Sequence, residues 1–348
     1  MKLGIIGLPQ AGKTTIFEAL AGARGEAPQQ KGGRSDHRIG TVRVADERVD
    51  FLSNLYHPKK TTYAQVEYLL PSDVGGPSAS TSESAQWNQV RSCDALIHVV
   101  RNFEGTLGVP PSPEADFRAV EEEMIIYDLA VVEKKVERLE LDAKRGKKDE
   151  EEIQALMEAC RILLEENRPL RSDAALASHP ALRGFTFLSA KPQLVIVNND
   201  DEDESMPEWQ TRPDRADMLV VRGGLEKEIA SLPPEEAEEF MTAYHIETSA
   251  LDRVIRSSYE ILDLISFFTV GEDEVKAWTI PKASSALEAA GAIHSDIQQG
   301  FIRAEVLAFE ELERLGSFQE AKKAGQVRLE GKEYVVRDGD IAHFRFNV

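Results

Sequence analysis

A glycine-rich segment near the start of the chain limits the possible folds more than any other feature of the sequence. Residues 7–14 read Gly-Leu-Pro-Gln-Ala-Gly-Lys-Thr and match the spacing G-x4-G-K-[ST] of a phosphate-binding loop. The apolar segment Lys2–Ile6 precedes the loop, and Lys13–Ala21 has the pattern of a helix. A strand, a glycine-rich loop and a helix in this order predict an α/β domain.

The residue types in the loop indicate how it would hold a phosphate group. Gly7 and Gly12 allow the chain to wrap with its N–H groups pointing inward, toward β-phosphate oxygens. Lys13 would neutralise charge on the β- and γ-phosphates, and the Thr14 hydroxyl would bind Mg²⁺. The alternative is a glycine-rich turn without a ligand. We expect a purine nucleotide, ATP or GTP with Mg²⁺, to be bound by Gly7, Pro9, Gln10, Ala11, Gly12, Lys13, Thr14 and Thr15.

The acidic composition excludes one broad class of function. The chain of 348 residues has 41 basic and 61 acidic residues, which gives a net charge of −20. Proteins that coat DNA or RNA need a positive surface against the phosphates, so this balance argues against indiscriminate nucleic-acid coating. It does not exclude a local basic face.

Hydrophobicity and cysteine content favour a cytoplasmic protein. No apolar run approaches the roughly 20 residues that a membrane-spanning helix needs, so we expect no membrane contact. The two cysteines, Cys93 and Cys160, are too few for a disulfide framework, and a reducing compartment is the default. Cys160 lies on an apolar helical stripe, which indicates a core position.

Apolar runs farther along the chain predict a parallel sheet. Asp94–Arg101, Lys191–Asn198 and Asp217–Val221 have the composition of buried strands, and helical patterns alternate with them. This alternation predicts a doubly wound, mostly parallel sheet. His98 lies in the middle of the first run and is interpreted as a packed core residue.

A different pattern separates the first two of these runs. Apolar residues follow one another at alternating intervals of four and three, the seam of a coiled coil, at Ile125, Leu129, Val132, Val136, Leu139 and Ala143. A turn at 145–149 and a second apolar stripe from Ile153 to Asn167 follow. Together they predict an inserted antiparallel α-helical coiled coil.

The C-terminal part of the chain predicts a separate domain. Short strand patterns at Phe267–Thr269, Val275–Ile280 and Gly300–Val306 precede a helical stretch at Phe309–Ala324, and strand patterns return by Ala342–Phe346. This mixture predicts a small α+β domain. We therefore expect residues 1–118 and 188–263 to form the P-loop nucleotide-binding domain, 119–187 the coiled-coil insertion and 264–348 the α+β domain.

Several segments together carry a resemblance to a known family. They are Asp94–Arg101, Phe267–Gly271, Ala277–Ile280, Gly300–Val306 and Arg337–Val348. Through them the chain resembles the YchF-type proteins of the Obg-related P-loop GTPases, from Lys2 to Val348. The resemblance implies a nucleotide-binding domain, an inserted coiled coil and a C-terminal TGS domain of β-grasp fold. It also implies that the ribosome is a partner.

The motif that senses the γ-phosphate departs from the family pattern. The family's D-x-x-G falls on Leu70 in strict register, and a shift of three residues gives Asp73-Val-Gly-Gly76. With that shift, the resemblance implies that Asp73 holds a Mg²⁺-bound water and that the Gly76 N–H senses the γ-phosphate. Without it, Gly75 and Gly76 belong to an ordinary loop. The threonine that the family uses to complete the metal shell is replaced by Arg34.

The motif for base recognition is also altered. A guanine site uses N-K-x-D, and the family pattern N-x-x-E goes with acceptance of ATP. The matching residues are Asn198-Asn-Asp-Asp201 or, one position later, Asn199-Asp-Asp-Glu202, and both lack the lysine. We expect Asn198 and Asp201 to line the nucleotide site, and the alternative for the acidic residues is a solvated loop. The family's S-A-K motif falls on Val221–Gly224, without its serine.

These features lead to two main functional hypotheses. The first is a nucleotide-dependent switch with slow hydrolysis, because Pro77–Ser92 contains no histidine that could position water, and the catalytic residue is unknown. The second is a pseudo-NTPase scaffold that binds nucleotide structurally. In both, the resemblance implies contact with the ribosome or RNA through the TGS-like domain and the coiled coil. An adaptor with an empty loop is disfavoured by the intact phosphate-loop motif.

Overall fold

The protein forms two structural units. The computed structural model describes residues 1–24, 37–72, 86–105, 108–144, 151–244, 246 and 249–347. The first unit combines Met1–Val42 with Glu67–Ile261, and the second combines Arg43–Val66 with Leu262–Val348. Within the described residues, no helix is both long enough and apolar enough to cross a bilayer.

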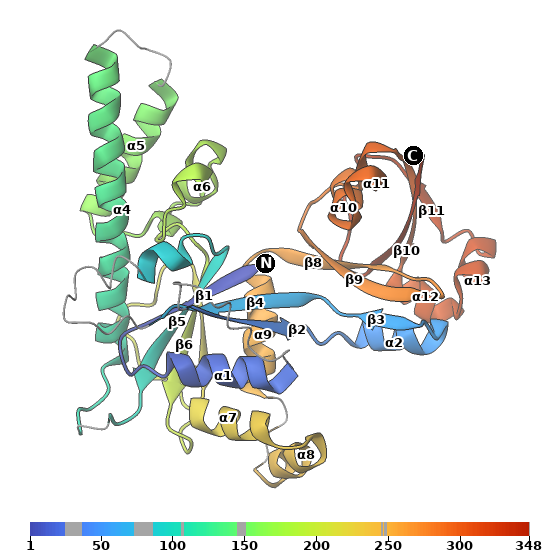
Figure 1. Ribbon diagram of the computed structural model, residues 1–348, viewed down its shortest axis with the longest axis horizontal. Coiled ribbons are helices and arrows are strands. Elements are labelled where there is room, and N and C mark those ends of the chain that lie inside the picture. The colour runs from blue at the N-terminus through green and yellow to red at the C-terminus, as the bar shows by residue number, and fades with distance from the viewer. Residues whose placement is uncertain are drawn as a thin grey trace. The chain divides into compact units, whose positions relative to one another are not determined.

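A six-stranded sheet forms the centre of the first unit (Figure 1). Its strands lie in the order β2-β4-β1-β5-β6-β7. Strand β1 pairs in parallel with β4 and β5, and β5, β6 and β7 continue the parallel arrangement. This confirms the predicted doubly wound, mostly parallel sheet. The strands are β1 Lys2–Ile6, β2 Arg38–Arg43, β4 Gln65–Leu70, β5 Ala95–Asn102, β6 Gln193–Asn199 and β7 Ala216–Val221.

Helices surround this sheet and extend beyond it. They are α1 Lys13–Arg24, α4 Pro113–Lys144, α5 Glu151–Glu165, α6 Ala174–Ser178, α7 Gly223–Ser231, α8 Pro234–Ala243 and α9 Ala250–Glu260, with 3₁₀ turns η1 Leu170–Ser172 and η2 Pro180–Phe185. Figure 1 shows α4 and α5 side by side as an antiparallel pair that projects from the sheet. The inserted helical pair is therefore confirmed, although the turn predicted at 145–149 lies outside the described residues.

The predicted heptad seam forms the core of this helical pair. Ile125, Val132 and Leu139 of α4 are buried against Met157 and Cys160 of α5. Every residue of the α4 stripe from Ile125 to Leu139 packs in this cluster, which agrees with a spacing of alternately four and three residues. Cys160 is fully buried there, as predicted.

Two buried acidic side chains attach α4 to the loop that leads into β6. Asp128 accepts hydrogen bonds from the N–H groups of Leu188, at 2.9 Å, and Ser189, at 2.7 Å, and from the Ser189 hydroxyl, at 2.7 Å. Glu121 forms an ion pair with the buried Arg171, which is the residue of η1 beside this loop. The helical pair is thus joined to the sheet by polar groups as well as by apolar packing.

The second unit is built on a mixed six-stranded sheet. The strand order is β11-β10-β12-β8-β9-β3, with β12 and β8 parallel and the pairs β10–β12, β10–β11 and β8–β9 antiparallel. Its strands are β3 Lys60–Thr62, β8 Leu264–Thr269, β9 Glu274–Pro281, β10 Phe301–Ala308, β11 Arg328–Glu330 and β12 Asp340–Phe346. Its helices are α2 Glu47–Tyr56, α10 Ala286–Ile293, α11 Ser295–Gln299, α12 Phe309–Leu315 and α13 Phe318–Lys323. The predicted α+β class of this region is confirmed.

Residues 43–66 lie with the C-terminal part of the chain. Strand β3 pairs in parallel with β9, from Lys60 opposite Glu274 to Thr62 opposite Lys276. In α2, the Arg48 guanidinium donates to Asp338 at 2.7 Å. Residues 43–66, predicted to belong to the nucleotide-binding domain, therefore lie in the second unit. The other predicted domain boundaries stay predictions.

Candidate functional site

The glycine-rich loop joins the carboxyl end of β1, a central strand of the first sheet, to the start of α1. Gly7 has φ +143°, and a Cβ atom there would lie 2.3 Å from the Val99 carbonyl oxygen. Gly12 has φ +95°, and its Cβ atom would lie 2.2 Å from the Asn198 side-chain nitrogen. Both positions therefore require glycine, for backbone conformation and for space.

Lys13 is held against this loop. Its side chain is buried, and its ammonium group donates hydrogen bonds to the carbonyl oxygens of Gly7 and Leu8, both at 2.9 Å. The first helical hydrogen bond of α1 runs from the Ile16 N–H to the Gly12 carbonyl, so the helix begins inside the motif. A buried cation beside a helix N-terminus forms an electropositive position that suits a phosphate group.

Thr14 lies on the first turn of α1 with its side chain exposed. A hydroxyl at this position fits Mg²⁺, which takes few protein ligands and keeps phosphate oxygens and water in its shell. In the described part of the chain, no group of three or more His, Cys, Asp or Glu residues could hold a metal ion. Asp73, the other predicted metal ligand, lies outside the described residues, as do Gly76 and Arg34.

Asn198 connects the phosphate loop to the turn that follows β7. It is the penultimate residue of β6, a strand that is buried over its whole length. Its side-chain nitrogen donates to the Ala11 carbonyl at 3.0 Å, and its side-chain oxygen accepts from the Gly223 N–H at 3.0 Å. The structure therefore brings Asn198 to the predicted loop, where both polar groups of the amide have partners in the protein.

Asp201 contacts the start of α7. Its carboxylate accepts a hydrogen bond from the Leu225 N–H at 2.9 Å. A Cβ atom on Gly224 would lie 2.8 Å and 3.1 Å from its two carboxylate oxygens, so both face the backbone of that turn. Asp201 thus pairs with an N–H group in the first turn of α7, the helix that begins in the altered S-A-K segment.

Two further asparagines lie at the same edge of the sheet: Asn199, which begins the alternative register of the base motif, and Asn102, which the sequence-based prediction did not include. The side chain of Asn102, which ends β5, donates to the side-chain oxygen of Asn199 at 2.9 Å. Asn199 in turn donates to the carbonyl oxygens of Asp203, at 3.0 Å, and Ser205, at 2.8 Å. The available signal was that each residue directly ends an apolar run, because the carboxyl ends of parallel strands meet at one edge.

His98 is a core residue, as predicted. It is buried in β5, its Nδ1 atom lies 3.1 Å from the side-chain nitrogen of Gln193, and its ring stacks on Phe117. Burial, together with the charges of Arg171 and Lys13, lowers the pKa of His98 to about 3. The imidazole is therefore neutral at physiological pH.

Comparisons with known proteins agree with the motif and the fold. Residues 264–347 match the YchF-GTPase_C family, whose description is "Protein of unknown function (DUF933)". "Ribosome-binding ATPase YchF" of Bacillus subtilis is 36% identical over 99% of this chain and 99% of the relative. The protein of the same name from Escherichia coli O157:H7 is 37% identical, over 100% of this chain and 99% of the relative.

The chain belongs to the YchF family. A solved structure supports the same assignment: that of the Schizosaccharomyces pombe YchF GTPase is 29% identical, with a TM-score of 0.87. The alignment covers 99% of this chain and 97% of the S. pombe chain. Membership of the YchF family therefore extends over both units, including the helical insertion.

Proposed function

We propose that the chain is a P-loop protein that binds ATP with Mg²⁺, turns it over slowly and uses the bound nucleotide to control its association with the ribosome. The observation that carries this proposal is the preformed phosphate loop. Lys13 donates hydrogen bonds to the carbonyls of Gly7 and Leu8, and Asn198 donates to that of Ala11, so hydrogen bonds within the protein hold the loop in one conformation. A preorganised loop loses less conformational entropy when it binds phosphate.

The residues of the loop have distinct roles in this proposal. In this proposal the N–H groups from Gln10 to Thr15 surround the β-phosphate, while Lys13 neutralises the β- and γ-phosphates. Proline has no N–H, so Pro9 contributes only contact and shape. Thr14, with Asp73 through water, would hold Mg²⁺, which neutralises charge as the terminal phosphate leaves.

ATP is favoured over GTP for two reasons. First, the relatives from B. subtilis and E. coli are named ATPases, although the S. pombe structure is named a GTPase. Second, guanine selection needs a carboxylate that accepts the N1 and N2 protons. The Asp201 carboxylate faces the start of α7 instead, where it accepts from the Leu225 N–H. In this proposal Asn198 and Asp201 line the adenine site and hold its surrounding backbone segments in place, through hydrogen bonds to the phosphate loop and to the start of α7.

We infer slow turnover from the sequence, because Pro77–Ser92 contains no histidine that could orient the attacking water. His98 is neutral and buried in the middle of β5, where its ring contacts Gln193 and Phe117. The second candidate function, a scaffold that binds nucleotide without hydrolysis, is favoured by the altered base and switch motifs. Release of phosphate over hours separates the two, because a scaffold would release none.

The ribosome is proposed as the partner because two relatives are named for binding it. The second unit contains the basic residues that we propose for contact with RNA, although several are paired internally. Lys322 and Arg345 both pair with Glu305, and Arg328 pairs with Asp340. Co-sedimentation with ribosomes should therefore weaken strongly between low and moderate salt. Equal recovery at both salt concentrations would contradict a contact with phosphate groups.

The first test of the proposal is calorimetric titration with ATP, GTP and their diphosphates, with and without Mg²⁺. Substitution Lys13→Ala should weaken ATP binding at least about tenfold, because it removes the main positive charge on the β- and γ-phosphates. Lys59→Ala serves as the matched control, since Lys59 is exposed and belongs to the second unit. Unchanged ATP affinity in Lys13→Ala would show that the loop is not the nucleotide site.

A further inference from the structure

A cavity of about 450 Å³ lies at the opposite edge of the first sheet from the phosphate loop. One side consists of Cys93 and Asp94, just before β5, and of Lys191 and Pro192, just before β6. Because these strands are parallel, their amino ends lie away from the edge that carries Asn102 and Asn198. The volume falls within the range of pockets that bind small molecules.

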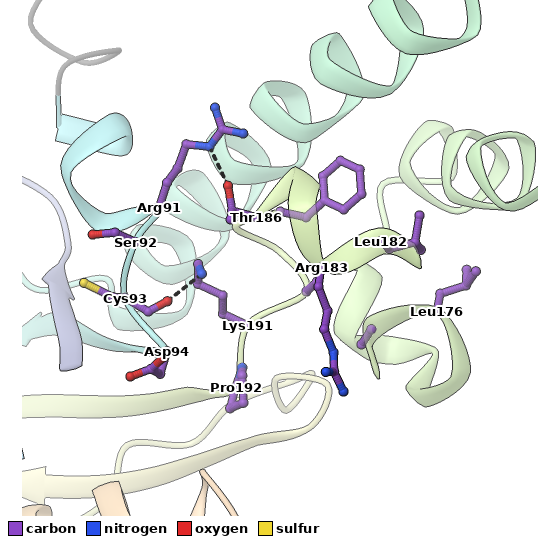
Figure 2. Close-up of a pocket in the computed structure, with 13 residues that line it drawn as sticks. Arg91, Ser92, Cys93, Asp94, Leu176, Leu182, Arg183, Thr186, Lys191 and Pro192 are labelled. Carbon is purple, nitrogen blue, oxygen red and sulfur yellow. Dashed lines mark hydrogen bonds between the residues drawn. The ribbon is translucent and has the colours of Figure 1, made fainter. Parts of the chain in front are cut away.

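The facing wall comes from the segment between the helical pair and β6. Figure 2 shows Leu176, Leu182 and Arg183 across from Cys93, Asp94, Lys191 and Pro192. Leu182 and Phe187 are buried members of the apolar cluster under α4 and α5, so this part of the wall is a firm apolar surface. The cavity therefore has one apolar side and one polar side.

The polar groups of the cavity are predominantly basic. Arg91, Arg183 and Lys191 are accompanied by one acid, Asp94, which gives the cavity lining a formal charge of +2 in a chain whose net charge is −20. The Asp94 carboxylate already accepts a hydrogen bond from the Lys2 N–H at 2.8 Å. Local positive charge in so acidic a protein indicates an anionic ligand.

Lys191 and Arg183 have N–H groups that could donate further hydrogen bonds to a ligand. The Lys191 ammonium donates to the Cys93 carbonyl at 2.6 Å, which uses one of its three protons (Figure 2). The Arg183 guanidinium forms no ion pair or hydrogen bond with any other residue that the structure describes. Burial lowers the pKa of Lys191, and an anion beside it would restore that pKa.

The segment of the cavity wall between Arg183 and Lys191 contains a residue with an unfavourable backbone conformation. Thr186 is β-branched and has φ +50°, a left-handed conformation that such residues rarely adopt. Arg91 supports it, with one nitrogen donating to the Thr186 hydroxyl at 3.2 Å and another to the Phe185 carbonyl at 2.7 Å. Backbone strain of this kind persists where the surrounding structure holds it, and it is concentrated at ligand sites.

We propose that this cavity binds a small organic carboxylate, with the carboxylate between Lys191 and Arg183 and an apolar body against Leu182 and Phe187. A monoanion suits the site better than a phosphate dianion because Asp94 lies on the rim. The same chemistry occurs in free carboxylic acids and at the C-terminus of a polypeptide that ends in an apolar residue.

The test compares two probes of equal size on the full-length protein. Octanoate has the charge and the apolar body, and octanamide has only the body. Protein NMR titration should give octanoate a Kd of roughly 0.1–1 mM, as expected for a ligand of about ten heavy atoms. Octanamide should bind at least tenfold more weakly. Equal affinity of octanoate and octanamide would overturn the proposal. It would also be overturned if neither these probes nor the peptide acetyl-Ala-Leu bound.

Variants connect the binding to the cavity. Lys191→Met and Arg183→Gln should each weaken octanoate binding at least threefold, and Ala177→Phe should block it by filling the space. Arg212→Gln, an exposed arginine away from the cavity, is the matched control and should bind like wild type. Circular dichroism and the melting temperature report whether each variant is folded. Octanoate binding that survives both Lys191→Met and Arg183→Gln in folded protein would contradict the proposed site.

A final comparison distinguishes a free carboxylic acid from the C-terminus of a polypeptide as the ligand. Acetyl-Ala-Leu with a free C-terminus is compared with its C-terminal amide. Binding of the free acid alone supports the proposed chemistry, and a preference for the peptide over octanoate would indicate a polypeptide end. ATP titration of the same variants should be unchanged, because the phosphate loop lies at the other edge of the sheet. A failure of this proposal is therefore distinct from a failure of the nucleotide site.

Discussion

Asn198 has the most demanding environment of the residues around the phosphate loop. It is buried, and its amide donates to the Ala11 carbonyl while accepting from the Gly223 N–H. No other side chain of similar size can both donate and accept in this way without rearrangement. The amide therefore sets the distance between the phosphate loop and the turn before α7, the two segments between which a nucleotide would bind.

Replacement of Asn198 by Asp tests this arrangement with almost no change of volume. Asn198→Asp should lower the free energy of unfolding by about 2–4 kcal/mol, because a buried carboxylate would face the Ala11 carbonyl with no donor between them. ATP affinity should fall at least tenfold as the loop loses its support. Urea unfolding and calorimetry measure the two effects. Asn54→Asp, on the exposed face of α2, should change stability by less than about 0.5 kcal/mol.

At the scale of elements, the helical pair depends on one face of α4. Ile125 is 3% exposed and packs in the seam, whereas the next residue, Ile126, is 66% exposed. Ile125→Ala should therefore cost about 2–4 kcal/mol of unfolding free energy, and Ile126→Ala should cost less than about 0.5 kcal/mol. Denaturant titration of both variants makes this comparison within a single helix. Equal losses would mean that α4 does not pack through the predicted seam.

The attachment of α4 should make stability depend on pH. Burial raises the pKa of Asp128 to about 6, despite the hydrogen bonds from Leu188 and Ser189 that oppose the shift. An aspartate in an unfolded chain titrates near pH 3.9. The folded protein therefore holds the proton of the Asp128 carboxyl group more tightly than the unfolded chain does. The stabilisation that results from this proton is fully present below about pH 4. That contribution is lost as the pH rises toward 6, by up to about 3 kcal/mol.

Urea unfolding between pH 4 and pH 7 isolates this contribution. The difference in unfolding free energy between wild type and Asp128→Asn should shrink as the pH rises to 6 if the variant is the less stable of the two. Whichever of the two proteins is the more stable, the difference in unfolding free energy should change between about pH 4 and pH 6 and level off at higher pH. Asp217→Asn, at an exposed position of β7, is the matched control. Parallel curves for wild type and Asp128→Asn would contradict the raised pKa.

At the scale of the whole molecule, the second unit is assembled from two separate parts of the chain. Residues 43–66 add strand β3 to the edge of its sheet and pack Phe51 of α2 against Phe309, with ring centroids 5.5 Å apart. A fragment of residues 264–348 alone should therefore melt at a lower temperature than a chain in which 43–66 is joined to it by a Gly/Ser linker. Calorimetry compares the two, and equal melting temperatures would mean that 43–66 contributes no stability.

Local sequence determined those features that depend on neighbouring residues. The phosphate loop, the heptad seam and the buried strands follow from spacing and composition, because each is formed within one segment or one periodic face. The helical stretch predicted at Phe309–Ala324 is present, and it is divided into two helices for a local reason as well. Gly316, with φ +74°, ends α12, and Ser317 then caps a separate helix, α13. The signal was present in the glycine.

Only the tertiary structure decided which distant groups meet. Asn198 reaches Ala11 because β6 and β1 lie on either side of β5, and Asp201 turns to α7 because that helix begins beside the end of β6. Residues 43–66 join the second unit through strand pairing that no local pattern encodes. Sequence alone thus determined the motif and the kinds of elements. Hydrogen bonds across the chain decided how the site is supported, because their partners depend on strand order rather than on spacing.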